Sequence, residues 1–275
     1  MTASLTFTML GAGSSGGVPR VGGQWGDCDP AEPRNRRRRC ALLIERHGAA
    51  GKTTRVLVDA GADLREQLLA QDVRELDAVL LTHAHADHIF GLDDLRQLAL
   101  MLGRPIDVHM DAATSATVTK AFGYCFRQAP GSSYPPFCRE RRITHPEPFG
   151  IDGPGGRLDV RTVLADHGDI DALGFRVGGL LYLPDAKRVV DAASEAGLAD
   201  VEVLIVDALR RRPHPSHMSL DEALGFIEQI RPRRAILTNL HSDLDYATLG
   251  AELPDGVEAG YDGLSVTLES PRDER

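Results

Sequence analysis

Three histidines and an aspartate stand within six consecutive residues, His83-Ala84-His85-Ala86-Asp87-His88. Neutral imidazole and carboxylate are ligands that zinc, manganese and iron accept in proteins, and one such cluster can serve two ions. The chain has only 10 histidines in 275 residues, so chance accounts poorly for this clustering. In an extended turn, His83 and His85 can point to one side while Asp87 and His88 turn toward a neighbouring position. The block therefore predicts a metal site.

The elements around this block indicate where further ligands should lie. Residues 78–82 form an apolar run that ends directly before the block, which predicts a buried strand. Three more potential ligands each follow a predicted strand: His167 after 158–165, Asp185 after 179–183, and His241 after 235–238. A single histidine after a strand is common at a protein surface, but the repeated placement at strand ends favours all three as ligands.

Composition and charge restrict the class of protein. Hydrophobic residues make up 42% and charged residues 26% of the chain, as in an ordinary soluble globular protein. The formal net charge of −9 argues against broad nucleic-acid binding, although it leaves room for a local basic grip on one phosphate. The first residues lack a signal-peptide pattern, and no run approaches the roughly 20 apolar residues that span a bilayer. We expect a cytoplasmic protein with free thiols and no membrane association.

Strands in both halves, with helices between them, predict two packed sheets between helical layers. Because no repeat or linker is evident, we expect a single domain, residues 1–270, and a C-terminal tail, 271–275. Residues 123–156 are rich in proline, glycine and aromatics, which predicts a long irregular loop. Its aromatic residues could form a lid, a dimer contact or part of the core: Tyr124, Phe126, Tyr134 and Phe137.

Two other segments could bind an anion. The glycine-rich turn 11–19 lets backbone N–H groups converge, although it could equally allow two chain segments to pass closely. The arginine-rich run 34–39 could grip a phosphate through one or two inward-facing guanidinium groups, or form solvated ion pairs. The residues leave both alternatives open in each case.

The order His-x-His-x-Asp-His, followed by a His, an Asp and a final His at strand ends, resembles the metallo-β-lactamase superfamily of hydrolases. Within it, segments 11–19, 29–39 and 88–96 are most similar to the phosphodiesterases of phosphonate breakdown that open phosphoribosyl 1,2-cyclic phosphate. The tRNA 3′-processing nucleases are more distant relatives. The resemblance implies a four-layer αββα fold with two divalent metal ions, zinc or manganese, at the sheet edges, and it suggests a homodimer.

The resemblance also implies a role for each candidate ligand. One ion would be held by His83, His85 and His167, the other by Asp87, His88 and His241, and both by Asp185. A hydroxide between the two ions would attack phosphorus. Asp59, at the end of the predicted strand 55–59, resembles the acid that orients a ligand histidine, although a plain turn acid is the alternative.

His217 precedes a predicted helix for which Ser219 is a good N-cap. In the related phosphodiesterases and nucleases, a histidine at this place protonates the leaving oxygen, a task that suits the ordinary pKa of imidazole. His214 is a weaker candidate, and a plain surface histidine is the structural alternative. Asp87 and His217 are thus the predicted catalytic residues, and the predicted substrate is a small phosphodiester.

Two departures from the family pattern affect the prediction. Cys28 stands alone where the phosphonate-pathway enzymes have a zinc-binding cysteine cluster, so we expect no structural zinc there. Asn239 occupies the place of the last ligand histidine, so His241 would have to reach from two residues later. The alternatives are a tRNA-processing nuclease, a thioester or lactone hydrolase on the same metal core, and a non-catalytic metal-binding module.

Overall fold

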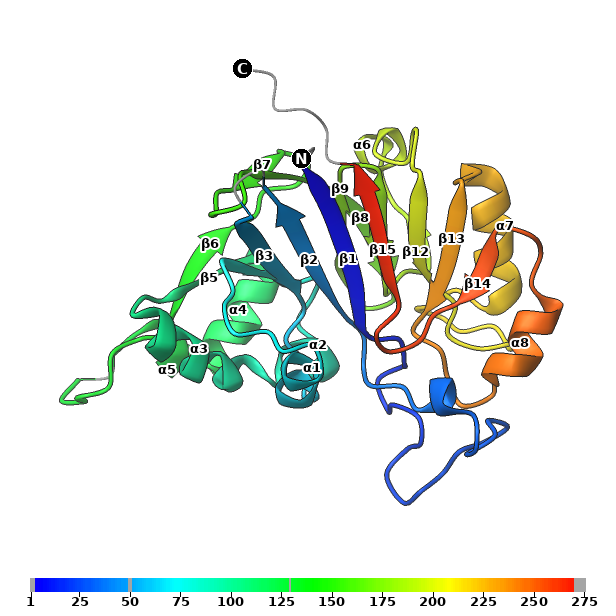
Figure 1. Cartoon of the computed structure of the whole chain (residues 1–275), viewed down its shortest axis with the longest axis horizontal. Helices are drawn as coiled ribbons and strands as arrows, with labels where there is room; N and C mark the ends of the chain where they lie inside the picture. The colour runs from blue at the N-terminus through cyan, green and yellow to red at the C-terminus, as the bar shows by residue number, and fades with distance from the viewer. Residues whose placement is uncertain (1–2, 49–50, 129, 270–275) are drawn as a thin grey trace. The chain divides into compact units, whose positions relative to one another are not determined.

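The computed structural model describes residues 3–48, 51–128 and 130–269; the predicted C-terminal tail, 271–275, lies outside them. The chain divides into two compact units, each built on its own β-sheet with helices beside it (Figure 1). Unit 1 comprises Met1–Thr8, Ala41–Asp159 and Ser265–Arg275, and unit 2 comprises Met9–Cys40 and Val160–Leu264. The assignment of residues 1–270 to one domain stays a prediction.

The sheet of unit 1 has seven strands in the order β15-β1-β2-β3-β4-β5-β6. Their bounds are β1 Ser4–Gly11, β2 Ala41–His47, β3 Thr53–Val58, β4 Ala78–Leu80, β5 Ile106–Met110, β6 Cys138–Arg142 and β15 Ser265–Glu269. β3, β4, β5 and β6 run parallel, whereas β2 pairs antiparallel with β3 and β1 with β15. β4 is buried along its whole length, which explains its short, wholly apolar sequence.

The helices of unit 1 connect or follow these strands. They are α1 Leu64–Ala70, α2 Ala86–Ile89, the 3-10 turn η2 Leu92–Asp94, α3 Leu95–Leu102, α4 Ala112–Ala121 and α5 Gly123–Phe126. α1 and α2 lie at one end of β2 and β3 (Figure 1). α3 buries Leu95, Leu98 and Ala99, the spacing of one apolar face of a helix.

The prediction that residues 123–156 form one irregular loop is wrong. The segment contains α5, β6 and the short strand β7 (Phe149–Ile151). β6 reads Cys-Arg-Glu-Arg-Arg and is the edge strand of its sheet, where Arg139 and Arg141 both pair with Asp107 of the neighbouring β5. Charged side chains are typical of edge strands and remove the apolar alternation by which a strand is recognised.

The sheet of unit 2 follows the order β11-β8-β9-β10-β12-β13-β14. Its strands are β8 Leu158–His167, β9 Ile170–Val177, β10 Leu180–Leu183, β11 Arg188–Val189, β12 Val203–Asp207, β13 Arg234–Thr238 and β14 Val257–Ala259. β10, β12, β13 and β14 run parallel, and β9 pairs antiparallel with both β8 and β10. β11 is followed closely by Asp191, whose side chain caps α6.

Unit 2 also contains the 3-10 turn η1 and the helices α6, α7 and α8, with bounds η1 Pro33–Asn35, α6 Ala192–Ala196, α7 Leu220–Ile230 and α8 Tyr246–Glu252. α7 buries Leu220, Ala223 and Ile227 in one apolar core with strand residues such as Leu204 and Leu237. Ser219 caps α7 as predicted, because its hydroxyl and Glu222 form a reciprocal capping box.

Strand direction brings the functional residues of each unit to one sheet edge. In unit 2, β8 and β10 both oppose β9 and so run the same way, and β12 and β13 run parallel to β10. The carboxyl ends of these four strands therefore meet at one edge, where ligands gather in open α/β sheets. Every helix in the described part of the chain falls short of the length and apolar character that a membrane span requires.

Candidate metal centre

In unit 1, the loops after β3 and β4 meet at the buried carboxylate of Asp59. Its Oδ2 lies 2.7 Å from His88 Nδ1, and its Oδ1 accepts hydrogen bonds from the backbone N–H of Thr82 at 2.9 Å and from the Thr82 hydroxyl at 3.0 Å. A carboxylate accepts hydrogen bonds, so Nδ1 of His88 carries the proton and its Nε2 keeps a lone pair for a metal ion. Asp59 thus makes the contact that the resemblance implies for the orienting acid, and the role itself stays a prediction.

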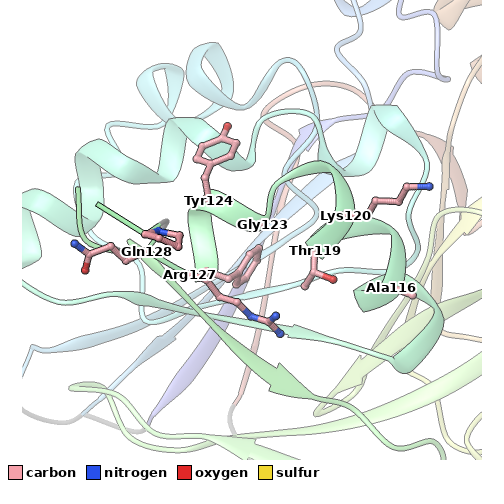
Figure 2. A pocket seen from close by; sticks show the side chains of 9 residues that line it. Ala116, Thr119, Lys120, Gly123, Tyr124, Arg127 and Gln128 are labelled. Atoms are coloured by element: carbon pink, nitrogen blue, oxygen red, sulfur yellow. The ribbon is translucent and has the colours of Figure 1, made fainter. Parts of the chain in front are cut away.

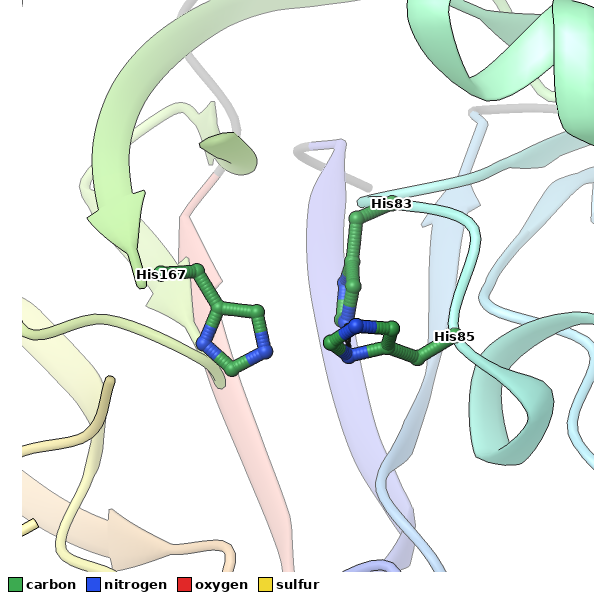
Figure 3. A group of neighbouring side chains, drawn as sticks. All are labelled: His83, His85 and His167. Carbon is green, nitrogen blue, oxygen red and sulfur yellow. Dashed lines mark hydrogen bonds between the residues drawn. The ribbon is translucent and has the colours of Figure 1, made fainter. Parts of the chain in front are cut away.

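The same carboxylate orients His83 through one intermediate. The hydroxyl of Thr82 donates to Asp59 and lies 2.9 Å from His83 Nδ1, so it can accept the proton of that nitrogen. His83 Nε2 then faces His85 Nδ1 at 3.0 Å, and Figure 3 shows the two imidazoles turned toward each other. This arrangement places two imidazole nitrogens together, as a divalent cation requires.

The backbone around Asp87 is packed tightly against the loop after β3. A Cβ added to Gly61 would lie 1.8 Å from the carbonyl oxygen of Asp87, so only glycine fits there. The Asp87 carboxylate lies 3.3 Å from His88 Nε2. Burial raises the pKa of Asp87, whereas the hydrogen bond and the charge of His88, when that ring is protonated, lower it to about 2. Asp87 is therefore a carboxylate at neutral pH, as a ligand must be.

Replacing Asp59 with asparagine should weaken metal binding roughly 10- to 100-fold, because both His88 and the Thr82–His83 pair lose their acceptor charge. Asparagine tolerates the left-handed backbone of this residue, whose φ is 66°, so backbone strain does not explain the effect. The measurement is competition for zinc with a chelating dye. Asp72→Asn is the matched control, since Asp72 has a φ of 49° and an exposed side chain. Equal affinity in both variants would contradict the orienting role.

Unit 2 brings together His167, Asp185 and His217, whose potential ligand atoms all lie within 4.8 Å of one another. His167, also drawn in Figure 3, ends β8, and its Nδ1 lies 2.9 Å from the carbonyl oxygen of Ser216. A carbonyl only accepts, so Nδ1 carries the proton and Nε2 is the ligand atom. His167 and Asp185 are both buried, as we expect of residues that hold a cation away from bulk water.

Asp207, which the sequence reasoning missed, holds His217. Its Oδ2 lies 2.7 Å from His217 Nδ1 and accepts a hydrogen bond from the backbone N–H of Ala186 at 3.0 Å. Burial raises the pKa of Asp207, and the neighbouring imidazole opposes that shift. The available signal was its position: Asp207 closes the apolar strand β12, just as Asp185 follows β10.

Asn239 lies among these carboxylates. It is buried with a φ of 61°, and its Nδ2 lies 3.2 Å from both Asp185 Oδ1 and Asp207 Oδ1. His241 Nδ1 lies 3.0 Å from Asp243 Oδ1, which leaves its Nε2 with a lone pair, and its backbone N–H donates to the carbonyl oxygen of Leu209. Asn239 thus fills the position after β13. His241 does not belong to the group of His167, Asp185 and His217, whose ligand atoms lie within 4.8 Å of one another. Its assignment as a ligand stays a prediction.

The arginine-rich run contains one inward-facing member, in line with the expectation of one or two. Arg37 is buried, and its guanidinium donates to Asn35 Oδ1 at 3.2 Å and to the carbonyl oxygen of His241 at 3.5 Å. Arg34 is exposed and pairs with Glu32 at 2.7 Å. Arg37 therefore braces the loop of His241, and the phosphate grip proposed for this run stays a prediction.

A hollow of about 510 Å³ lies beside α4 and α5 in unit 1 (Figure 2). Tyr124 and Phe126 of the aromatic segment line it, together with Lys120 and Arg127. Phe137 packs into the core instead, whereas Tyr134 is exposed. None of the predicted ligands lines this hollow, so we assign it no part in the reaction.

The side chains of both units fit divalent metal ions. Each unit offers buried imidazoles, and the rings of His83, His88 and His167 are held through Nδ1, which leaves Nε2 for the cation. Carboxylates are present beside them in Asp87 and Asp185. Mixed imidazole and carboxylate sets suit zinc and manganese.

Comparison with known proteins agrees with this chemistry. The beta-lactamase superfamily domain matches residues 54–239. The chain is 46% identical to ribonuclease Z of Bradyrhizobium diazoefficiens over 264 residues, covering 76% of this chain and 85% of that protein. It is also 34% identical to an octanoyltransferase of Porphyromonas gingivalis over 95% of this chain, but it spans only 51% of that protein's length. A crystal structure of a diphosphatase from the PhnP family is 30% identical, with a TM-score of 0.84 over 98% of this chain and 99% of that one.

The chain therefore belongs to the beta-lactamase superfamily. The predicted metallo-β-lactamase fold, a mixed α/β structure with two sheets, is confirmed by the family match and by that structural neighbour. The relatives from this superfamily include hydrolases, and the protein is accordingly a metal-dependent hydrolase. Zinc-bound PqqB from Methylobacterium extorquens, at 18% identity and a TM-score of 0.70, shares the fold.

Proposed function

We propose that this protein is a phosphodiesterase that hydrolyses a small cyclic or nucleotide-like phosphodiester, of the phosphoribosyl 1,2-cyclic phosphate type. One observation carries the proposal: His217 lies within 4.8 Å of His167 and Asp185 while Asp207 holds its Nδ1. A phosphodiester has an alkoxide leaving group that needs a proton, whereas hydrolysis of a thioester would leave such a histidine without a task. The 30% identical diphosphatase from the PhnP family supports chemistry at phosphorus.

The proposed ligands are those expected from the sequence. One ion is assigned to His83, His85 and His167, the other to Asp87, His88 and His241, and both to Asp185. Two divalent ions, zinc or manganese, would supply a water that ionises near neutral pH and would neutralise the charge on the phosphate oxygens. Asp59 and Thr82 keep the first histidines in the required tautomers. Asp87, anionic at neutral pH, supplies charge to the site.

His217 is the proposed proton donor. With Nδ1–H held by Asp207, a protonated ring keeps its Nε2–H to give to the leaving oxygen. The buried carboxylate stabilises the imidazolium and prevents rotation of the ring. Asn239 donates to the carboxylates of Asp185 and Asp207, which fixes their relative positions.

A panel of substrates tests the proposal on protein loaded with zinc or manganese. The panel contains a five-membered ribose cyclic phosphate, a linear dinucleotide, bis(p-nitrophenyl) phosphate, a precursor tRNA and an acyl thioester. We expect the highest kcat/KM on the cyclic phosphate and no hydrolysis of the thioester. Thioester hydrolysis without diester hydrolysis would overturn the assignment.

A tRNA-processing nuclease is the second candidate, because the curated ribonuclease Z relative is 46% identical over most of both chains. The net charge of −9 opposes it, since binding of a polyanion rests on clustered positive charge. Site-specific cleavage of the precursor tRNA at a rate above that for the cyclic phosphate would establish the nuclease. The proposal also includes a cytoplasmic location and a homodimer. Sedimentation velocity would test the homodimer by measuring the mass of the protein in solution.

A further inference from the structure

Lys187 makes contacts that connect three elements of unit 2. It lies two residues beyond Asp185, and its backbone N–H donates to the carbonyl oxygen of Asp166 at 2.7 Å. Its ammonium group donates to Glu222 Oε1 at 2.6 Å and to the carbonyl oxygen of His217 at 3.4 Å. One side chain therefore ties the peptide of His217 to the first turn of α7.

Glu222 is itself fixed, so the connection is rigid. Its Oε2 accepts from the backbone N–H of Ser219 at 2.8 Å and from the Ser219 hydroxyl at 2.9 Å, which leaves Oε1 for Lys187. The capping box thus anchors the carboxylate, the carboxylate anchors the ammonium, and the ammonium holds the carbonyl of His217. Asp207 holds the other end of the same residue, at the ring.

We propose that Lys187 is a positioning residue that keeps the peptide of His217 in place so that its ring can protonate the leaving group. The inference rests on the proposed role of His217. The pair of Lys187 and Glu222 is partly exposed, so its direct contribution to stability is small. Its importance lies in geometry, because a small misplacement of a catalytic group can reduce the rate about 100-fold.

The surroundings permit a clean substitution. A cavity of about 320 Å³ adjoins this pair, and its walls include Met218 and Phe226. A methionine at position 187 can follow the path of the lysine stem beside these apolar side chains. The backbone hydrogen bond from residue 187 to Asp166 is retained in Lys187→Met, so the strand end that carries His167 is unaffected.

The experiment compares two diesters that differ in the need for a proton. In Lys187→Met, kcat should fall roughly 10- to 100-fold for a diester with an alkyl leaving group. It should change less than about threefold for bis(p-nitrophenyl) phosphate, whose leaving group departs as an anion. Glu222→Gln should behave alike, because glutamine keeps the capping box and loses the charge. Arg234→Met, which removes the ion pair with Glu258 at the far end of β13, is the matched control and should act like the wild type on both diesters.

A second measurement does not depend on turnover. Amide hydrogen exchange of a peptide spanning residues 214–219 should be faster in Lys187→Met than in the wild type, with zinc affinity unchanged. Equal loss on both diesters, or unchanged exchange, would overturn the role of Lys187. Wild-type protein that hydrolyses no diester would instead overturn the proposed function, so the two failures are distinguishable.

Discussion

His217→Ala should lower kcat for the cyclic phosphodiester by roughly 10²- to 10⁴-fold, the usual contribution of a positioned general acid. The expected cause is the loss of the proposed proton donor, the imidazole whose Nδ1 is held by Asp207. Turnover of bis(p-nitrophenyl) phosphate should fall far less, because its leaving group needs no proton. Steady-state kinetics on the two diesters provides the measurement.

Metal content decides between the two roles that the geometry allows His217. Its ring belongs to the same group as His167 and Asp185, so it could be a ligand instead of a proton donor. We expect His217→Ala to retain its metal by mass spectrometry of metals, whereas His167→Ala should lose part of it. His214→Ala, which removes the weaker candidate, is the control and should keep most activity. A metal-poor His217→Ala protein would contradict the role of proton donor.

Removal of the metal should abolish activity on every diester that the protein hydrolyses, and return of zinc or manganese should restore it. Because the buried ligands are held in place before the ion binds, the folded state binds it and the unfolded state binds it weakly. At a free metal concentration 100 times Kd, binding stabilises the fold by about 2.7 kcal/mol. The chelated protein should therefore melt roughly 5–10 °C lower than the loaded protein.

Calorimetric melting with and without a chelator, followed by metal titration, makes this measurement. The titration should saturate near two ions per chain if both sites are built as proposed. Asp185→Asn provides the matched variant, because it keeps the size of the proposed shared ligand and removes its charge. Chelated protein with full diesterase activity would exclude a metal-dependent mechanism.

The residues next to one another in the chain were sufficient to predict the metal chemistry. His83, His85 and His88 are close neighbours in sequence, so their types and spacing alone indicate a common ligand cluster. Apolar runs that end at His167 and Asp185 also predicted strand ends correctly. These strand ends can be predicted because an apolar run and the polar residue that follows it are local properties of the sequence.

Edge strands and irregular connections were predicted less well. β6 consists mostly of charged residues, and its partner Asp107 lies more than 30 residues away in β5. Nothing within the segment itself indicates a strand, because its stability comes from pairing with a neighbour. The same holds for β11, which is only two residues long and pairs with the end of β8.

Residue types and their spacing were enough to predict a histidine- and aspartate-rich metal site at the ends of strands in an α/β protein. The contacts of Asp207 and Asn239 became apparent from the folded chain, since each contacts residues that strand order brings beside it. The folded chain also places Asp59 where it can orient two histidines of the next loop. A few adjacent residues define the type of ligand, because side-chain chemistry is local. Orientation depends instead on hydrogen bonds across parallel strands, whose register no local pattern specifies.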